Sequence, residues 1–150
     1  MRWLFAAMHL LALGVGLGAV WARARALGGT LDPAGVRRVL SADTWWGVAA
    51  ALWISTGLVR LFGGLEKGTG YYLTNHVFLA KMGMLAVILL LELGPMVTFV
   101  QWRRQSGGGG PVDTRRAGRF ARTSYVQAVL VILMVLAATA MARGFGARGV

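Results

Sequence analysis

Long apolar runs separated by short arginine-rich segments dominate the chain. A hydrocarbon core of about 30 Å is crossed by a helix of about 20 mostly apolar residues, and four runs have this character. They cover residues 4–21, 45–65, 76–100 and 125–142. The pattern therefore predicts an all-α integral membrane four-helix bundle, with residues 1–150 forming a single four-span transmembrane domain.

The first run has a second interpretation, as a signal peptide that follows a short basic start. Small residues on either side of Arg23 would then supply a cleavage site. Basic residues directly after an apolar run oppose its export, however, and Arg23 and Arg25 stand in that position. We therefore expect the run to be the first span.

Composition agrees with a membrane protein and narrows its chemistry. The chain is 57% hydrophobic, and its mean hydropathy is +0.62, which is high for a soluble domain. The absence of cysteine excludes disulfides, cysteine-ligated metals and iron–sulfur clusters. The net charge of +11 would suit a nucleic-acid partner, but most of it flanks the apolar runs, as in membrane proteins. We therefore expect membrane lipids as partners, and no nucleic acid.

The distribution of basic residues predicts the topology, because cytoplasmic loops carry the excess of lysine and arginine. Ten arginines lie in segments 22–44 and 101–124, against four basic residues on the opposite side. Both loops are thus expected in the cytoplasm and both termini outside, in the periplasm, for a multi-pass protein of a bacterial inner membrane. We expect the loop arginines, Arg23 included, to orient the chain and contact lipid headgroups.

The first loop carries a helix signal of its own. Asp32 can cap a helix that starts at Pro33. The apolar side chains of Val36 and Val39 would then lie opposite Arg37 and its neighbour, which predicts a short amphipathic helix on the membrane surface. A solvated connector is the alternative.

Three polar residues inside the spans fall at one predicted depth. His9, Arg60 and Lys81 each lie about five residues, or about 7.5 Å, from the outer end of their span. Ionisable groups within spans normally face the bundle interior and indicate functional sites. The alternatives are that Arg60 and Lys81 snorkel to the interface and that His9 hydrogen-bonds a neighbouring helix.

Glu92 shares a helix face with Lys81, because eleven residues correspond to a phase difference of only about 20°. The two are about 16.5 Å apart along the axis, too far to pair. Gln127, Ser55, Thr56 or a proton of its own would satisfy Glu92. A second helix face follows a 3-4-3-4 spacing and comprises Trp46, Ala49, Trp53, Thr56 and Arg60.

Glycines in the first span allow close approach to another group. Gly14 and Gly18 form a GxxxG pattern, which permits helices to pack closely. Gly16 lies seven residues from His9 and so on its face, where a flat ligand such as a porphyrin would have room. Plain helix packing is the other interpretation.

The stretch FGGLEKGTGYYLTNHVFLAKMG, together with AAMHLLALGVGLGAVWARA and TWWGVAAALWISTGL, resembles an uncharacterised family of bacterial four-span membrane proteins over nearly the whole chain. The resemblance implies a class rather than an activity.

The layout also distantly resembles the HemJ-type protoporphyrinogen oxidases, small membrane proteins that bind haem b. The matching features are AAMH in the first span, HVFLAKMGML in the third and RRAGRFARTSY before the fourth. The resemblance implies that His9 is an axial haem ligand and that Lys81 faces substrate or a propionate. Those oxidases typically have a second histidine about eleven residues after the lysine, where this chain has Glu92.

Three hypotheses remain open. In the first, the protein binds haem b or a porphyrin and is a redox enzyme: His9 is the metal ligand, Gly16 gives the ring space, Arg60 and Lys81 hold propionates, and Lys81 and Glu92 are catalytic. In the second, it is a small transporter or channel subunit that uses the same layer and Glu92. In the third, it is a structural or accessory membrane protein, as a monomer or a homo-oligomer.

Overall fold

The structure, a computed structural model that describes residues 2–63 and 74–145, consists of four long helices. They are α1 (Arg2–Leu27), α2 (Pro33–Phe62), α4 (His76–Gly107) and α5 (Ala117–Ala142). All four are long and apolar enough to cross a membrane, and the described residues contain no strand. The predicted all-α membrane bundle is confirmed.

The start of α2 confirms the predicted helix signal but not the predicted surface helix. The side chain of Asp32 accepts a hydrogen bond from the backbone N–H of Gly35, and Pro33 is the first helical residue. The segment then continues without interruption to Phe62, because nothing between Pro33 and Trp45 breaks a helix. A separate amphipathic helix in the first loop is therefore wrong: these residues form the first turns of a spanning helix.

Helices α4 and α5 also extend beyond the apolar runs from which they were predicted. α4 begins at His76 as expected, after Asn75, whose side chain accepts hydrogen bonds from the backbone N–H of Val77 and Phe78. It ends at Gly107 rather than near residue 100, and α5 begins at Ala117 rather than residue 125. Helical structure therefore extends through much of the two arginine-rich segments.

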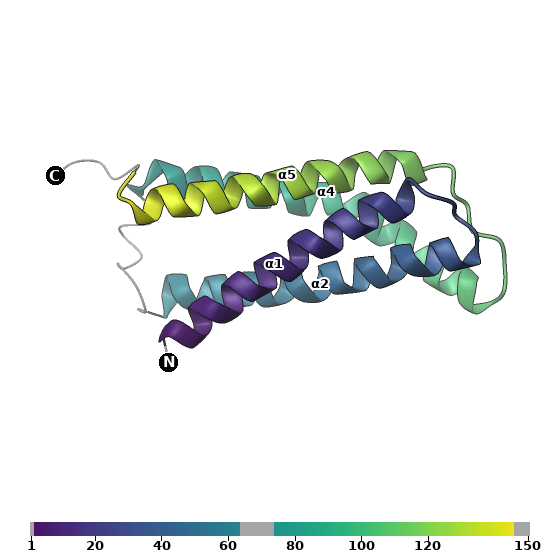
Figure 1. Cartoon of the computed structure of the whole chain (residues 1–150), viewed down its shortest axis with the longest axis horizontal. Coiled ribbons are helices and arrows are strands. Elements are labelled where there is room, and N and C mark those ends of the chain that lie inside the picture. Colours follow the sequence, from purple (N-terminus) through teal and green to yellow (C-terminus); the bar gives the residue numbers. More distant parts are fainter. Residues whose placement is uncertain (1, 64–73, 146–150) are drawn as a thin grey trace.

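The four helices cross rather than run strictly parallel. Figure 1 shows α1 running diagonally, beside α2 near its N-terminus and towards α5 near its C-terminus. Helix α4 starts behind α5 and crosses behind α2 towards its C-terminal end. One apolar cluster joins all four helices around Val20, Trp53, Ile88 and Met134. A second cluster, around Phe99 and Trp102, fills the end that carries the two described interhelical connections.

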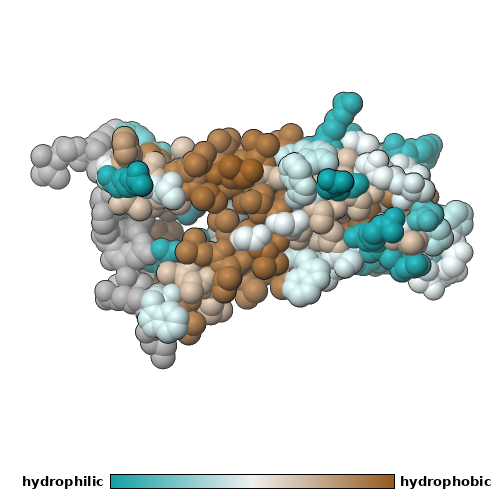
Figure 2. Space-filling view, viewed as in Figure 1, coloured by the Kyte–Doolittle hydropathy of each residue, from teal (hydrophilic) through white to brown (hydrophobic). Residues whose placement is uncertain are grey.

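The outer surface divides into an apolar belt and a polar end. Figure 2 shows brown, apolar side chains around the middle of the molecule and teal, hydrophilic ones gathered at the end that carries the α1–α2 and α4–α5 connections. We call this the arginine-rich end; its arginines are Arg23, Arg25, Arg37, Arg38, Arg103, Arg104, Arg115, Arg116, Arg119 and Arg122. A belt of exposed apolar side chains is typical of helices that face lipid.

Candidate functional site

A buried arginine lies at the point where the four helices meet. Arg23 belongs to the penultimate turn of α1, and none of its surface is exposed. The expectation that this residue contacts lipid headgroups is therefore wrong. Its place in the helix explains the difference, because Arg23 follows Val20 by three residues and precedes Leu27 by four, and both are buried.

All five N–H groups of the Arg23 guanidinium have an acceptor. Nε donates to Ser124 Oγ at 3.1 Å. Nη1 donates to Asp43 Oδ1 at 2.9 Å and to Glu92 Oε1 at 2.7 Å. Nη2 donates to Glu92 Oε2 at 2.9 Å and to Gln127 Oε1 at 2.8 Å. One side chain of α1 is thus bonded to α2, α4 and α5, and we call this set the Arg23 network.

The carboxylate of Glu92 receives donors from all three other helices. Besides Arg23, the indole Nε1 of Trp46 donates to Oε2 at 3.0 Å, and the amide of Gln127 donates to it at 2.7 Å. The same amide nitrogen donates to the backbone carbonyl of Ile88 at 3.2 Å. The prediction that Gln127 is a hydrogen-bond partner of Glu92 is therefore confirmed.

A second ion pair extends the Arg23 network towards the surface. Asp43 accepts from Arg23 through Oδ1 and from Arg103 through Oδ2, the latter at 3.0 Å. Arg103 also donates to the backbone carbonyl of Leu40 and to Thr44 Oγ1. The charges alternate along Glu92, Arg23, Asp43 and Arg103, so the two cations and two anions cancel.

Aromatic rings flank the guanidinium. Its central carbon lies 5.9 Å from the ring centroid of Trp46 and 5.7 Å from that of Phe99. Cation–π attraction operates at such distances and is stronger where water is excluded. None of the Arg23 surface is exposed, and a buried setting of this kind strengthens the electrostatic interactions of the guanidinium.

His9 lies in a separate polar contact, between α1 and α2. Its Nδ1 is 2.9 Å from Thr56 Oγ1, and Trp53 Nε1 donates to its Nε2 at 3.1 Å. Because an indole nitrogen only donates, Nε2 is the acceptor, and Nδ1 of a neutral ring carries the proton and donates to Thr56. The predicted hydrogen bond from His9 to a neighbouring helix is confirmed, and iron ligation by either ring nitrogen would require breaking one of these contacts.

The remaining predicted site residues have varied surroundings. Gly16 packs against α2, and a Cβ there would lie 3.4 Å from Ala49 Cβ and 3.5 Å from the Trp46 ring. Arg60 and Lys81 are both half-buried, on α2 and α4. The single layer expected from His9, Arg60 and Lys81 stays a prediction. Within residues 2–63 and 74–145, no group of three or more histidine, aspartate and glutamate side chains could hold a metal.

The family model described as "Predicted membrane protein (DUF2214)" matches residues 1–146. The chain belongs to this family. Comparison with curated proteins and with solved structures gives no match. Membership of DUF2214 confirms the expected resemblance to a family of membrane proteins, and the resemblance to the HemJ-type oxidases stays a prediction.

The sequence analysis of this DUF2214 protein did not identify Arg23 as an interior residue. Arg23 directly follows an apolar run, where arginines usually determine the orientation of a span. A pattern in α1 would have revealed it: the buried positions His9, Ala12, Gly16 and Ala19 follow a 3-4-3 spacing, and the next interval of four reaches Arg23. Asp43 likewise lies three residues before the buried Trp46, on the face that includes Trp53. If the buried faces of α1 and α2 had been extended beyond the apolar runs, Arg23 and Asp43 would both have been predicted to face the bundle interior.

Proposed function

We propose that this DUF2214 protein is a structural or accessory membrane protein, whose interior polar groups lock four helices into one arrangement. The observation that carries the proposal is the saturation of Arg23, whose five N–H groups are bonded to side chains of α2, α4 and α5. A group bonded on every side holds its neighbours in place.

The energetics of buried charges support this role. A desolvated ion pair often gives little net stability compared with apolar packing, whereas removal of one partner alone is costly. Such pairs instead favour one arrangement over others, because an alternative packing would leave a charge without a partner. Every buried side-chain nitrogen and oxygen among the described residues has a hydrogen-bond partner. These hydrogen bonds favour one packing of the four helices, as a fixed scaffold requires.

The test compares two arginines of the same end. Arg23→Met removes the centre of the Arg23 network, whereas Arg37→Met removes an exposed arginine of α2 with the same change in charge. The proposal expects Arg23→Met to accelerate amide hydrogen exchange in all four helices of the detergent-purified protein, and Arg37→Met to leave exchange unchanged. Unchanged exchange in Arg23→Met would contradict a locking role.

A transporter or channel role is the second candidate, and the alternating charges favour it. They lead from the fully buried Arg23 to Arg103, whose side chain is 37% exposed, and the carboxylates of Asp43 and Glu92 lie between these extremes at 16% and 19%. Chains of ionisable groups inside membranes are used in proton relays. Sealed vesicles containing the protein would acidify under a potassium-driven potential, and Glu92→Gln would stop this. Vesicles that stay at constant pH would rule against this candidate.

A further inference from the structure

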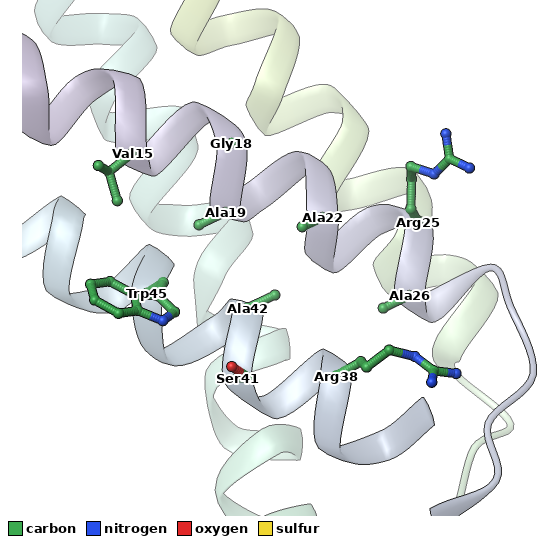
Figure 3. A pocket seen from close by; sticks show the side chains of 10 residues that line it. All are labelled: Val15, Gly18, Ala19, Ala22, Arg25, Ala26, Arg38, Ser41, Ala42 and Trp45. Atoms are coloured by element: carbon green, nitrogen blue, oxygen red, sulfur yellow. The ribbon is translucent and has the colours of Figure 1, made fainter. Parts of the chain in front are cut away.

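The surface between α1 and α2 contains an open groove of about 710 Å³ at the arginine-rich end. Its apolar part is formed by small or flat side chains, and Figure 3 shows Ala19 and Ala22 of α1 facing Ala42 of α2, with Trp45 at one end. The volume falls within the range of about 300–1,000 Å³ that is common for small-molecule sites.

Two arginines stand at the other end of the groove. Figure 3 shows Arg38 of α2 extending past Ala26, whereas the side chain of Arg25 points from α1 away from α2, so the two guanidinium groups diverge. Both side chains are exposed, and among the described residues neither guanidinium has a carboxylate partner. This contrasts with Arg23 and Arg103 of the same end, which are neutralised by Asp43 and Glu92.

Charge and shape together define what complements this groove. The arginines need an anion that bonds several N–H groups, a role to which phosphate oxygens are suited. The adjoining walls need an apolar group that extends into the membrane. Trp45 is 59% exposed and lies where an indole ring would contact lipid near the headgroup boundary. One molecule with a charged head and an apolar tail meets all of these conditions.

We propose that the groove binds an anionic diacyl phospholipid, with one acyl chain along Ala19, Ala22 and Trp45. Its phosphate binds Arg38, and the exposed side chain of Arg25 turns towards the groove to become the second ligand. The proposal adds a ligand on the outer surface and does not depend on the locking role of the Arg23 network. An outward-facing site can fail without affecting the interior, and the two are tested by different residues.

The glycines of α1 provide a matched pair of variants that test the apolar part. Gly18 lines the groove and Gly14 does not, although both are exposed and a Cβ at either would meet nothing within 4 Å. Gly18→Leu therefore fills the groove without disturbing the packing of α1 on α2, and Gly14→Leu adds the same side chain one turn away. A second matched pair tests the charged part: Arg25→Gln/Arg38→Gln and Arg37→Gln/Arg104→Gln each remove two exposed arginines of the same end.

The experiment is native mass spectrometry of the detergent-purified chain during titration with phosphatidylglycerol or with phosphatidylcholine of the same acyl chains. A hydrogen bond to a charged group contributes about 1.5 kcal/mol, or roughly tenfold in affinity, so Arg25→Gln/Arg38→Gln should weaken the tightest phosphatidylglycerol site about 100-fold. Arg37→Gln/Arg104→Gln should leave that site within a few-fold of the parent, as should Gly14→Leu. Gly18→Leu should weaken it at least tenfold.

Three results would overturn the proposal. Equal losses in the two double-arginine variants would show attraction by general charge alone. Equal binding by Gly18→Leu and Gly14→Leu would show that no acyl chain enters the groove. A dimer that becomes a monomer in Gly18→Leu, with lipid binding unchanged, would assign the groove to a second copy of the chain. The melting temperature of each variant without added lipid checks that it is folded.

Discussion

The carboxylate of Glu92 meets the guanidinium of Arg23 at two points, with Nη1–Oε1 at 2.7 Å and Nη2–Oε2 at 2.9 Å. Parallel two-point contacts of this kind are the strongest form of the arginine–carboxylate interaction. The pair joins α1 to α4 through residues 69 positions apart in the chain. Two expected outcomes, for Glu92→Met and for Arg23→Lys, depend on this pair.

Removal of Glu92 alone should destabilise the protein strongly. Glu92→Met leaves Arg23 buried with only Asp43 to neutralise it, and breaking a buried pair typically costs about 3–5 kcal/mol. Arg23→Met/Glu92→Met removes both charges and should recover most of that loss, because Asp43 keeps its ion pair with Arg103. Unfolding in mixed micelles of sodium dodecyl sulfate, followed by tryptophan fluorescence, gives the free energies for this double-mutant cycle. Additive effects of the two single variants would contradict the pairing.

Lysine should not replace arginine at position 23. An ammonium has three donors, where the Arg23 guanidinium uses five in a fixed plane. Glu92 Oε2 keeps the donors of Trp46 and Gln127. An ammonium can serve at most three of the other four acceptors, so Arg23→Lys leaves at least one of them without a donor and should cost about 1–3 kcal/mol. The same micelle unfolding measures it. Arg37→Lys, on the exposed face of α2, is the control and should have no measurable effect.

The contact between Trp53 and His9 predicts a tautomer. Nitrogen-15 NMR of the labelled imidazole should show a neutral ring with the proton on Nδ1, because Nε2 accepts from the indole. Trp53→Phe removes that donor, and the cost should be about 1–3 kcal/mol for a buried acceptor left unpaired. A ring protonated on Nε2 would contradict the assigned hydrogen bonds.

The optical spectrum of the same purified protein tests the haem hypothesis. A Soret band that disappears in His9→Ala would show that His9 ligates haem iron, and the ring could then not keep both of its hydrogen bonds to Trp53 and Thr56.

The connection between α4 and α5 predicts a pH dependence of its own. The side chain and backbone N–H of Arg115 donate to Asp113 and lower the pKa of that carboxyl from its usual 3.8 to about 2. The stabilisation from this contact is therefore complete above pH 3.8 and is lost as the pH falls through about 2. Carbon-13 NMR of Asp113 should give a midpoint near the lower value, and Arg115→Gln should move the midpoint back towards 3.8. A midpoint unchanged by Arg115→Gln would mean that the two side chains do not pair in solution.

Close packing of α1 on α2 at Gly16 limits the size of the side chain that position 16 can accommodate. Gly16→Leu forces a branched side chain against Ala49 and the Trp46 ring, and overpacking of this kind typically costs about 1–3 kcal/mol. Gly14→Leu, on an open face of the same helix, should have little effect. Thermal unfolding in one detergent compares the two. Equal melting temperatures would mean that α1 and α2 separate at this point.

The sequence predicted the number, type and approximate place of the helices, because a membrane requires long apolar segments and few other structures satisfy it. Helix ends were harder to predict. Arg103 and Phe120 lie in segments that hydropathy assigns to loops, yet both are helical and contact other helices. Tertiary contacts extend helices past the apolar run, and a pattern based on hydropathy does not include such contacts.

The polar interior was predictable only in part. Glu92 and Gln127 stood out because each lies in or beside an apolar run, and the structure joins them. Arg23 did not stand out, since arginines at the ends of spans usually determine orientation. Its role depends on the crossing of α1 towards α5, which places Ser124 and Gln127 beside it. A residue 101 positions away in the chain cannot be identified from local spacing.

The saturation of Arg23 has a consequence for biosynthesis. Partners on α2 and α4 emerge from the ribosome before α5, which supplies Ser124 and Gln127 last. A nascent chain that stops short of α5 therefore keeps two guanidinium N–H groups without their acceptors, and Glu92 without the amide of Gln127. Completion of the final helix closes the last of these bonds, so truncated chains remain distinguishable from finished ones by an unsatisfied cation.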